Sequence, residues 1–141
     1  MTHIQQVHDV VARTLWGEAR GEGIAGQVAV AWVIRNRVHD ANARSWWGEG
    51  YIGVCRKPWQ FSCWNLGDPN YPYVSGARPI DQAQLTQALA VAQQVIDGQV
   101  PDPTDGATHY HALGMSVPPV WASGATRTQV LGAHAFFKHV P

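Results

Sequence analysis

The sequence predicts a mainly helical α+β fold in a single domain, on the evidence of three observations. Apolar residues recur at helical spacing in two segments before residue 40 and in a third after residue 81. Two segments after residue 106 suit short strands. A chain of 141 residues with 45% hydrophobic and only 14% charged residues is long enough and apolar enough for one folded domain with its own core.

The first predicted helix covers about residues 3–16. Its apolar residues share one face at helical spacing and are Ile4, Val7, Val10, Val11 and Leu15. Gly17 is expected to end the helix. Glu18 would then project from the helix end beside Trp16, and the glycines that follow would allow a tight turn.

The second predicted helix runs from Ile24 to about His39 and is apolar on nearly all sides. Such a helix is usually buried in the middle of its domain, so we expect it to be the central helix. Near its end Arg35, Asn36 and Arg37 are expected to emerge from the core, where positive charge suits the helix dipole.

Residues 41–80 are rich in Gly, Pro, Asn, Ser and aromatic residues, which predicts turns with one or two short strands and no long helix. A stretch of this kind in a compact domain usually has a function, such as lining a binding cleft. Asp81 is the expected N-cap of a third helix, which Gly98 closes. Beyond it we predict strands at Ala107–Leu113 and Val130–Lys138, separated by a long loop.

The charge and the N-terminal residues restrict the partners that we expect. The net charge is zero at pH 7, so the chain lacks the positive field that attracts nucleic acid or anionic membranes. No apolar run approaches the length of a membrane span, and Met1–Gln6 carries no secretion signal. We therefore expect no nucleic-acid partner, no membrane insertion and synthesis in the cytoplasm.

The strongest chemical signal is the sequence WGEARGEG at residues 16–23, which holds two of the three glutamates in the chain. Cleavage of a glycosidic bond needs a carboxylic acid that protonates the leaving oxygen. Glu18, held against Trp16, is the candidate acid, with Glu22 as a second, supporting carboxylate. The alternative is two exposed glutamates at a helix end with Arg20 as a solvated partner, because this spacing alone is a weak signal.

Two groups in the middle of the chain are further candidates. Possible sugar-binding residues, which could equally form a structural turn, are Gln60, Phe61, Ser62 and Trp64. Cys55 and Cys63 enclose seven residues and match no common zinc spacing. A disulfide between them and a pair of reduced cysteines in the core are both open alternatives.

A zinc-dependent amidase is another hypothesis. In a strand His109 and His111 would point to the same face, and His134 or His139 could supply a third ligand. However, the chain has no H-E-x-x-H motif, and a role for His109 and Tyr110 in a groove or core is favoured, with no metal or other cofactor. A catalytic serine elbow is also absent, and a non-catalytic glycan-binding module that uses the Trp-rich middle is a further alternative.

Six stretches of the sequence resemble those of one family over nearly the full chain. They lie at residues 15–22, 26–31, 33–38, 53–55 with 60–62, 106–110 and 132–137. The family is the cell-wall hydrolases of the spore cortex-lytic (SleB) type, which also occur among phage endolysins. The pairing of GEARGE with GQVAVA is the most specific part of the resemblance.

The resemblance implies a lysozyme-like domain with a small β-sheet beside a glycan-binding groove. It also implies that Glu18 acts as acid and then base in lytic transglycosylation, which cleaves peptidoglycan between N-acetylmuramic acid and N-acetylglucosamine. Glu22 would then support the geometry of the motif. The nearest alternative is a hydrolytic muramidase that uses Glu18 with a second carboxylate.

The spore enzymes carry a secretion signal and a wall-binding domain, and this sequence shows neither. We therefore expect a phage endolysin that depends on a holin for its release, with a bacterial or prophage relative as the alternative. It would be made in the host cytoplasm and would act on the periplasmic or extracellular cell wall.

Overall fold

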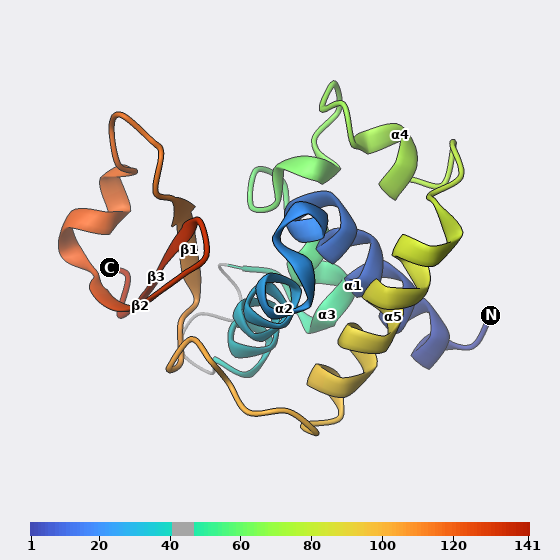
Figure 1. The fold of residues 1–141 in the computed structure, drawn as a ribbon, viewed down its shortest axis with the longest axis horizontal. Coiled ribbons are helices and arrows are strands. Elements are labelled where there is room, and N and C mark those ends of the chain that lie inside the picture. Colours follow the sequence, from blue (N-terminus) through green and yellow to red (C-terminus); the bar gives the residue numbers. More distant parts are fainter. Residues whose placement is uncertain (41–46) are drawn as a thin grey trace.

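The computed structural model describes residues 1–40 and 47–141 and confirms the mainly helical α+β fold (Figure 1). The helices are α1 (His3–Ala19), α2 (Gly23–His39), α3 (Gly50–Arg56), α4 (Tyr71–Val74) and α5 (Gln82–Ile96). The strands are β1 (His109–Ala112), β2 (Thr126–Leu131) and β3 (His134–Lys138), and short 3-10 turns cover Arg20–Glu22, Ser62–Trp64 and Val120–Gly124. Within the described residues, no helix is both long enough and apolar enough to cross a membrane.

Helix α1 begins at a capping box and extends further than the sequence predicts. The hydroxyl of Thr2 accepts a hydrogen bond from the backbone of Gln5, whose side chain accepts one from the backbone of Thr2. The predicted end at Gly17 is wrong, because the helix continues to Ala19. The glycine instead allows a close contact, since a Cβ at Gly17 would lie 2.6 Å from the Cβ of Cys63.

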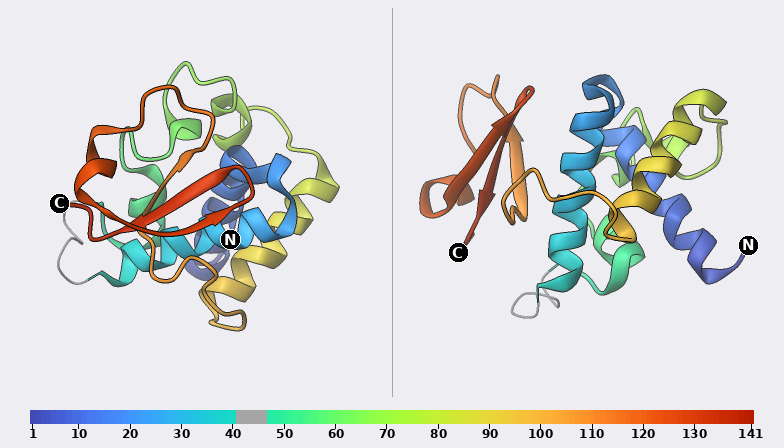
Figure 2. Two further views of the ribbon diagram at one scale, coloured as in Figure 1. Left: turned by 60° about the vertical axis from the view of Figure 1, so that its left-hand side comes forward. Right: turned by 60° about the horizontal axis from the view of Figure 1, so that its bottom comes forward.

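Helix α2 is the buried central helix, as predicted (Figures 1 and 2). Val30, Ala31 and Ile34 join the main core that α2 shares with α1, α3 and α5. Ala29 and Val33 face the other way and form a smaller core with sheet residues. A helix that packs on both sides has no solvent face, which explains its nearly uniform apolar sequence.

The three residues expected to emerge at the end of α2 do not do so. Nη1 of Arg35 donates to the carbonyl oxygens of Val95 and Ile96, both at 2.7 Å, which satisfies acceptors at the end of α5. The side-chain amide of Asn36 donates to Asp102 and to the backbone of Ala107. Arg37 is buried, with 4% of its surface exposed. Each side chain therefore connects α2 to a neighbouring segment.

The middle of the chain contains short helical segments. Within residues 47–80 there is no strand, so the predicted short strands are wrong for this part, and residues 41–46 of the same prediction lie outside the described residues. Helix α3 buries Val54 and Cys55 in the main core. Asp81 caps α5 as predicted, because its side chain accepts a hydrogen bond from the backbone of Gln84 at 3.0 Å.

The strands form an antiparallel sheet in the order β1-β3-β2, which stands beside α2 (Figure 2). The single strand predicted at Val130–Lys138 is wrong, because Gly132 turns the chain with a φ of 56° and separates β2 from β3. Tyr110 pairs with Phe136, and His109 pairs with Phe137. Since paired residues share a face, Tyr110 and Phe136 face α2 while His109 and Phe137 face away from it.

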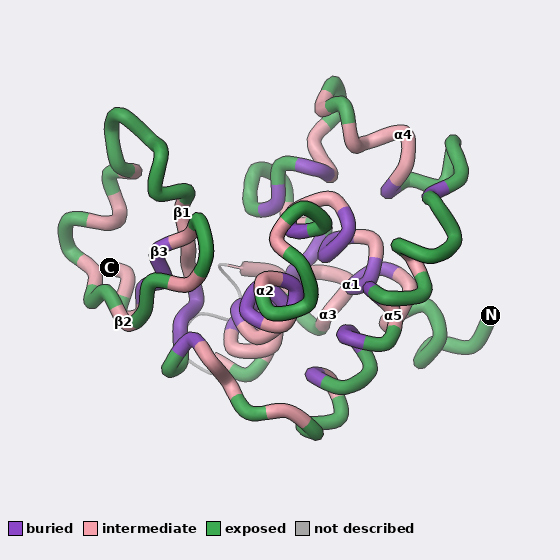
Figure 3. Tube along the Cα trace, viewed as in Figure 1, coloured by how far each residue is buried: buried purple, intermediate pink, exposed green. Residues whose placement is uncertain are grey.

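Burial follows this arrangement (Figure 3). Buried residues are concentrated along α1 and α2 and at Ala135, Phe136 and Phe137 of β3. The connection between β1 and β2 is largely exposed. The sheet is thus anchored to the helices by its inner face and by β3.

Candidate active site

The carboxylate of Glu18 is the point at which three distant segments meet. Glu18 lies in the last turn of α1. Its Oε1 accepts a hydrogen bond from the hydroxyl of Tyr110 in β1 at 2.9 Å. Its Oε2 accepts one from the backbone N–H of Cys63 at 3.2 Å and lies 3.5 Å from the hydroxyl of Ser62. The structure therefore brings together Glu18, Ser62 and Tyr110, which the sequence analysis had identified as separate candidates.

Tyr110 is a hydrogen-bond donor to this carboxylate. Burial, reinforced by the negative charge of Glu18, raises the pKa of Tyr110 well above its usual value. The phenol is therefore protonated near neutral pH, as a donor must be. Its ring is fixed between Phe136 and His134, with centroids 5.7 and 5.1 Å away.

Arg37 places a buried positive charge behind the site. Its Nε donates to the backbone oxygen of Thr108 at 2.6 Å, and its Nη1 lies 3.4 Å from Oε1 of Gln60. Its guanidinium lies 5.0 Å from the centre of the buried Phe61 ring. Burial lowers the pKa of Arg37 to about 10, and the nearby Tyr110 and Glu18 oppose that shift, so it stays charged near neutral pH.

Sequence reasoning missed Arg37 because a cation near a helix C-terminus is usually solvated. One signal was available. In helix α2 Arg37 follows the buried Val30 by seven residues, which is two helical turns, and residues at this spacing share one side of the helix.

Glu22 belongs to a neighbouring contact with the β2–β3 hairpin. Its Oε1 lies 3.5 Å from Nδ1 of His134 at the start of β3. If Gly132 carried a Cβ atom, that atom would lie only 3.0 Å from Oε2 of Glu22. The hairpin turn therefore lies directly against the Glu22 carboxylate. This contact fastens the hairpin to the chain segment after Glu18.

Trp16 does not lie beside Glu18. Its Nε1 donates to the side chain of Gln84 in α5 at 2.8 Å, and its ring packs on Tyr73. Residues two apart in a helix point roughly 200° apart around its axis. The expectation that Trp16 forms an apolar wall for Glu18 is therefore wrong.

Trp64 and His109 contact residues other than Glu18. Nε1 of Trp64 donates to the hydroxyl of Thr14 at 2.9 Å, and the ring packs against the main core. His109 lies on the outer face of β1 between Trp47 and Trp121, with ring centroids 5.6 and 4.9 Å away. Burial lowers the pKa of His109 to about 4, and the charge of Arg37 adds to the shift.

The histidines do not converge on a metal site. His111 shares the outer face of β1 with His109, since it stacks on Phe137, whereas His134 contacts Glu22 and Tyr110 on the inner face. Among the residues that the structure describes, no three His, Cys, Asp or Glu side chains are placed to hold a metal ion.

The two cysteines are free and buried rather than joined by a disulfide. Burial raises the pKa of Cys55 to about 12 and that of Cys63 well above its usual value. Buried thiols with raised pKa values are poor nucleophiles. The contribution of Cys63 to the site is its backbone N–H.

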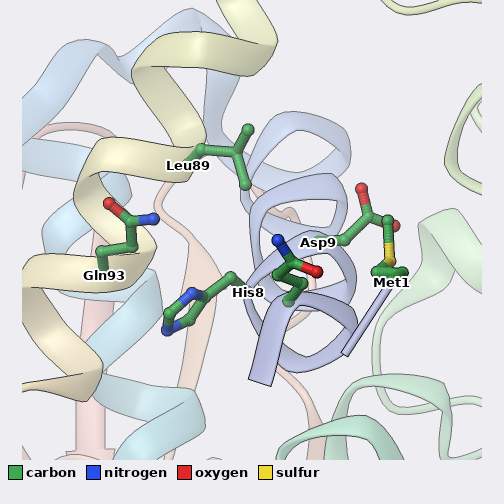
Figure 4. A pocket seen from close by; sticks show the side chains of 6 residues that line it. Met1, His8, Asp9, Leu89 and Gln93 are labelled. Carbon is green, nitrogen blue, oxygen red and sulfur yellow. The ribbon is translucent and has the colours of Figure 1, made fainter. Parts of the chain in front are cut away.

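A surface depression between α1 and α5 lies apart from the site (Figure 4). It is lined by Met1, Gln5, His8, Asp9, Leu89 and Gln93. Asp9 precedes Glu18 by roughly 13 Å along the axis of α1. This depression therefore contributes nothing to the chemistry of Glu18.

The fold and the site together define a class of protein. A mainly helical domain with a small antiparallel sheet beside it is the arrangement of a lysozyme-like fold, and here Glu18 at the end of a helix accepts a hydrogen bond from that sheet. A model of the cell wall hydrolase family matches residues 21–137, so the chain belongs to that family. Glu18 lies just before the matched region.

Two solved structures show the same fold. One is the catalytic domain of the germination-specific lytic transglycosylase SleB from Bacillus anthracis, with a TM-score of 0.71 and 28% identity over 95% of each chain. The other is the catalytic domain of the Bacillus cereus SleB protein, with a TM-score of 0.72 and 28% identity over 95% of this chain and 91% of that one. No curated protein sequence matches.

Proposed function

We propose that this cell wall hydrolase cleaves the glycan strands of peptidoglycan as a lytic transglycosylase, with Glu18 as the single catalytic acid and base. The observation that carries the proposal is the carboxylate of Glu18, which receives hydrogen bonds from Tyr110 and Cys63. The similarity to a SleB protein that is itself a lytic transglycosylase supports the reaction type.

The reaction needs one carboxyl group. Protonated Glu18 gives its proton to the glycosidic oxygen as the bond from that oxygen to the anomeric carbon of N-acetylmuramic acid breaks. The C6 hydroxyl of the same sugar then attacks the anomeric carbon, and its proton goes to the Glu18 carboxylate. The products are a 1,6-anhydro sugar end and a free hydroxyl on N-acetylglucosamine, no water is consumed, and Glu18 regains its proton.

The neighbours of Glu18 suit both steps. Tyr110 and the N–H of Cys63 are fixed donors that stabilise the negative charge that Glu18 carries between the two proton transfers. Buried Arg37 adds a positive charge to the same region. A hydrolytic muramidase would need a second carboxylate placed for water or sugar. Glu22 is less suited to that task because its carboxylate lies against His134 and the hairpin turn.

Mass spectrometry of fragments from purified peptidoglycan tests the proposal. The wild type should release muramic acid ends lighter by one water than reducing ends, and Glu18→Gln should release none while it remains folded. Glu49→Gln is the matched control, since Glu49 is the third glutamate of the chain and is exposed at the start of α3. If the wild type released reducing ends, the enzyme would be a hydrolase. If it released free stem peptides, it would be an amidase. Full activity of Glu18→Gln would refute the role of Glu18.

We propose an endolysin role as the biological setting, supported by the resemblance of the sequence to phage endolysins. The enzyme would be made in the host cytoplasm and would reach the periplasmic or extracellular wall through a holin. Expression in a bacterial host with and without a holin tests this setting. Lysis only with the holin is expected, and equal lysis without it would contradict the dependence.

A further inference from the structure

Trp59 is an exposed aromatic residue on the loop that reaches Glu18. Its relative exposure is 82%, whereas Phe61 in the same loop is buried. Among the described residues, no side chain makes a hydrogen bond or ring contact with its indole, and only its backbone N–H is engaged. The packing of the domain therefore does not explain why a tryptophan occupies this position.

The backbone of Trp59 is held in a conformation that does not suit its side chain. Its φ is 68°, in the left-handed region that is rare for bulky residues. The N–H of Trp59 donates to Oδ1 of Asn65 at 3.3 Å, and the N–H of Asn65 donates to the oxygen of Ser62 at 2.9 Å. Residues held under such strain cluster at functional sites, because there the direction of the side chain matters more than local stability.

The position of Trp59 in the chain places its backbone close to the residues that contact Glu18. Ser62 follows three residues later, and its hydroxyl and the next backbone N–H point to Glu18. Three residues span at most about 11 Å between Cα atoms. The indole is thus within reach of a sugar that neighbours the one at Glu18.

We infer that Trp59 is a sugar-stacking platform for the glycan strand beside the cleaved bond, an inference that rests on the proposed function. One face of a pyranose ring carries mainly C–H groups and is apolar, so it packs on a flat indole without loss of hydrogen bonds. The indole N–H stays available for a polar group such as the acetamide of the sugar. The uncharged contact also suits a chain without a net charge.

Binding to insoluble purified peptidoglycan tests the inference, measured in the Glu18→Gln background so that the wall stays intact. Trp59→Gly should weaken binding about five- to tenfold, as expected for loss of one anchoring aromatic residue. The same substitution should leave the thermal midpoint unchanged or raise it, because glycine adopts the observed φ without strain. Trp59→Tyr keeps a flat ring and should retain most of the affinity. Val120→Ala is the matched control, since Val120 is 93% exposed in the turn on the outer side of the sheet.

Two results would overturn the inference. Unchanged wall binding in Trp59→Gly would show that the indole does not contact the glycan. A fall in stability that accounts for the loss of binding would show that Trp59 is structural. In the active enzyme Trp59→Gly should raise KM and leave kcat within about twofold. Fragment analysis of the wild type tests the proposed function separately. If the wild type cleaves glycan strands but Trp59→Gly binds peptidoglycan as tightly as before, only the sugar-stacking role of Trp59 is refuted.

Discussion

Tyr110 is the residue whose removal tests the geometry around Glu18 most directly. Tyr110→Phe keeps the ring between Phe136 and His134 and deletes only the hydroxyl that donates to Glu18. A hydrogen bond to a charged group contributes about 1.5–3 kcal/mol, so kcat should fall about 10- to 100-fold. The free energy of unfolding should fall by a similar amount, about 1.5–3 kcal/mol, because the folded carboxylate loses the same hydrogen bond. Initial rates of peptidoglycan clearing and urea unfolding measure the two quantities.

Tyr73→Phe is the control for this substitution. Tyr73 packs on Trp16, on a side of α1 that does not carry Glu18. Its variant should clear peptidoglycan at the wild-type rate. A Tyr110→Phe enzyme that is equally active would show that activity does not depend on the hydrogen bond from the hydroxyl to Glu18.

For individual residues, the sequence was a better guide to which side chains lie at the site than to which groups they contact. Glu18 was identifiable because it lies in a short motif with few competing carboxylates. Its donors were not assignable, since Cys63 contributes a backbone N–H that no side-chain pattern reports. Trp16 was misplaced because adjacency in sequence is not adjacency on a helix surface.

The contact between α1 and the Ser62–Trp64 turn is the element-scale feature that positions Glu18. A Cβ at Gly17 would lie 2.6 Å from Cβ and 2.8 Å from Sγ of Cys63. Gly17→Ala must therefore separate the helix from the turn, and we expect a loss of about 1–3 kcal/mol in the free energy of unfolding. The N–H of Cys63 would move with the turn, so activity should fall further than stability explains.

Gly21→Ala is the matched control at a glycine four residues away. A Cβ at Gly21 meets nothing within 4 Å. The free energy of unfolding should stay within about 0.5 kcal/mol of the wild type. Denaturant unfolding and rates of peptidoglycan clearing should be measured for both variants. Equal effects of Gly17→Ala and Gly21→Ala would contradict close packing at Gly17.

Elements were predictable where they are long and periodic. Helices α1, α2 and α5 were recognisable from apolar spacing, and the cap at Asp81 was recognisable from residue type. The end of α1 was not, because tertiary contact with Cys63 outweighs the low helix propensity of Gly17. Helix α3 has seven residues, too few for a helical period to stand out from a run of turns.

At the scale of the whole molecule, the stability of the enzyme depends on how firmly the sheet is joined to the helices. The join uses a small second core of Ala29, Val33, Ala107 and Phe136, together with polar contacts around Asp102. Although burial raises the pKa of Asp102, hydrogen bonds from Thr104, Asn36 and Gly106 outweigh it, and the net pKa is lowered. The contacts of the second core could not be predicted from the sequence, because α2 and the sheet are distant segments of the chain.

The pH dependence of stability follows from His109, which lies on the outer face of β1 between Trp47 and Trp121 and whose pKa is lowered by burial and by the charge of Arg37. Its pKa is about 4 in the folded protein and close to 6.5 when unfolded, so between these values the unfolded chain binds more protons. Stability should therefore be greatest above pH 6.5 and should fall as the pH drops toward 4. Asp102, with a lowered pKa, holds its contribution through this range and loses it only in stronger acid.

His109→Gln, which cannot gain a proton, should flatten the decline between pH 6.5 and 4. The difference should be on the order of 1–2 kcal/mol, because partial exposure screens the charge. Urea unfolding of the wild type and the variant at pH 7 and pH 5 measures it. His3→Gln is the control, since His3 is exposed at the start of α1 and its loss should leave the wild-type pH dependence in place. An equally steep decline in His109→Gln would place the acid-sensitive group elsewhere.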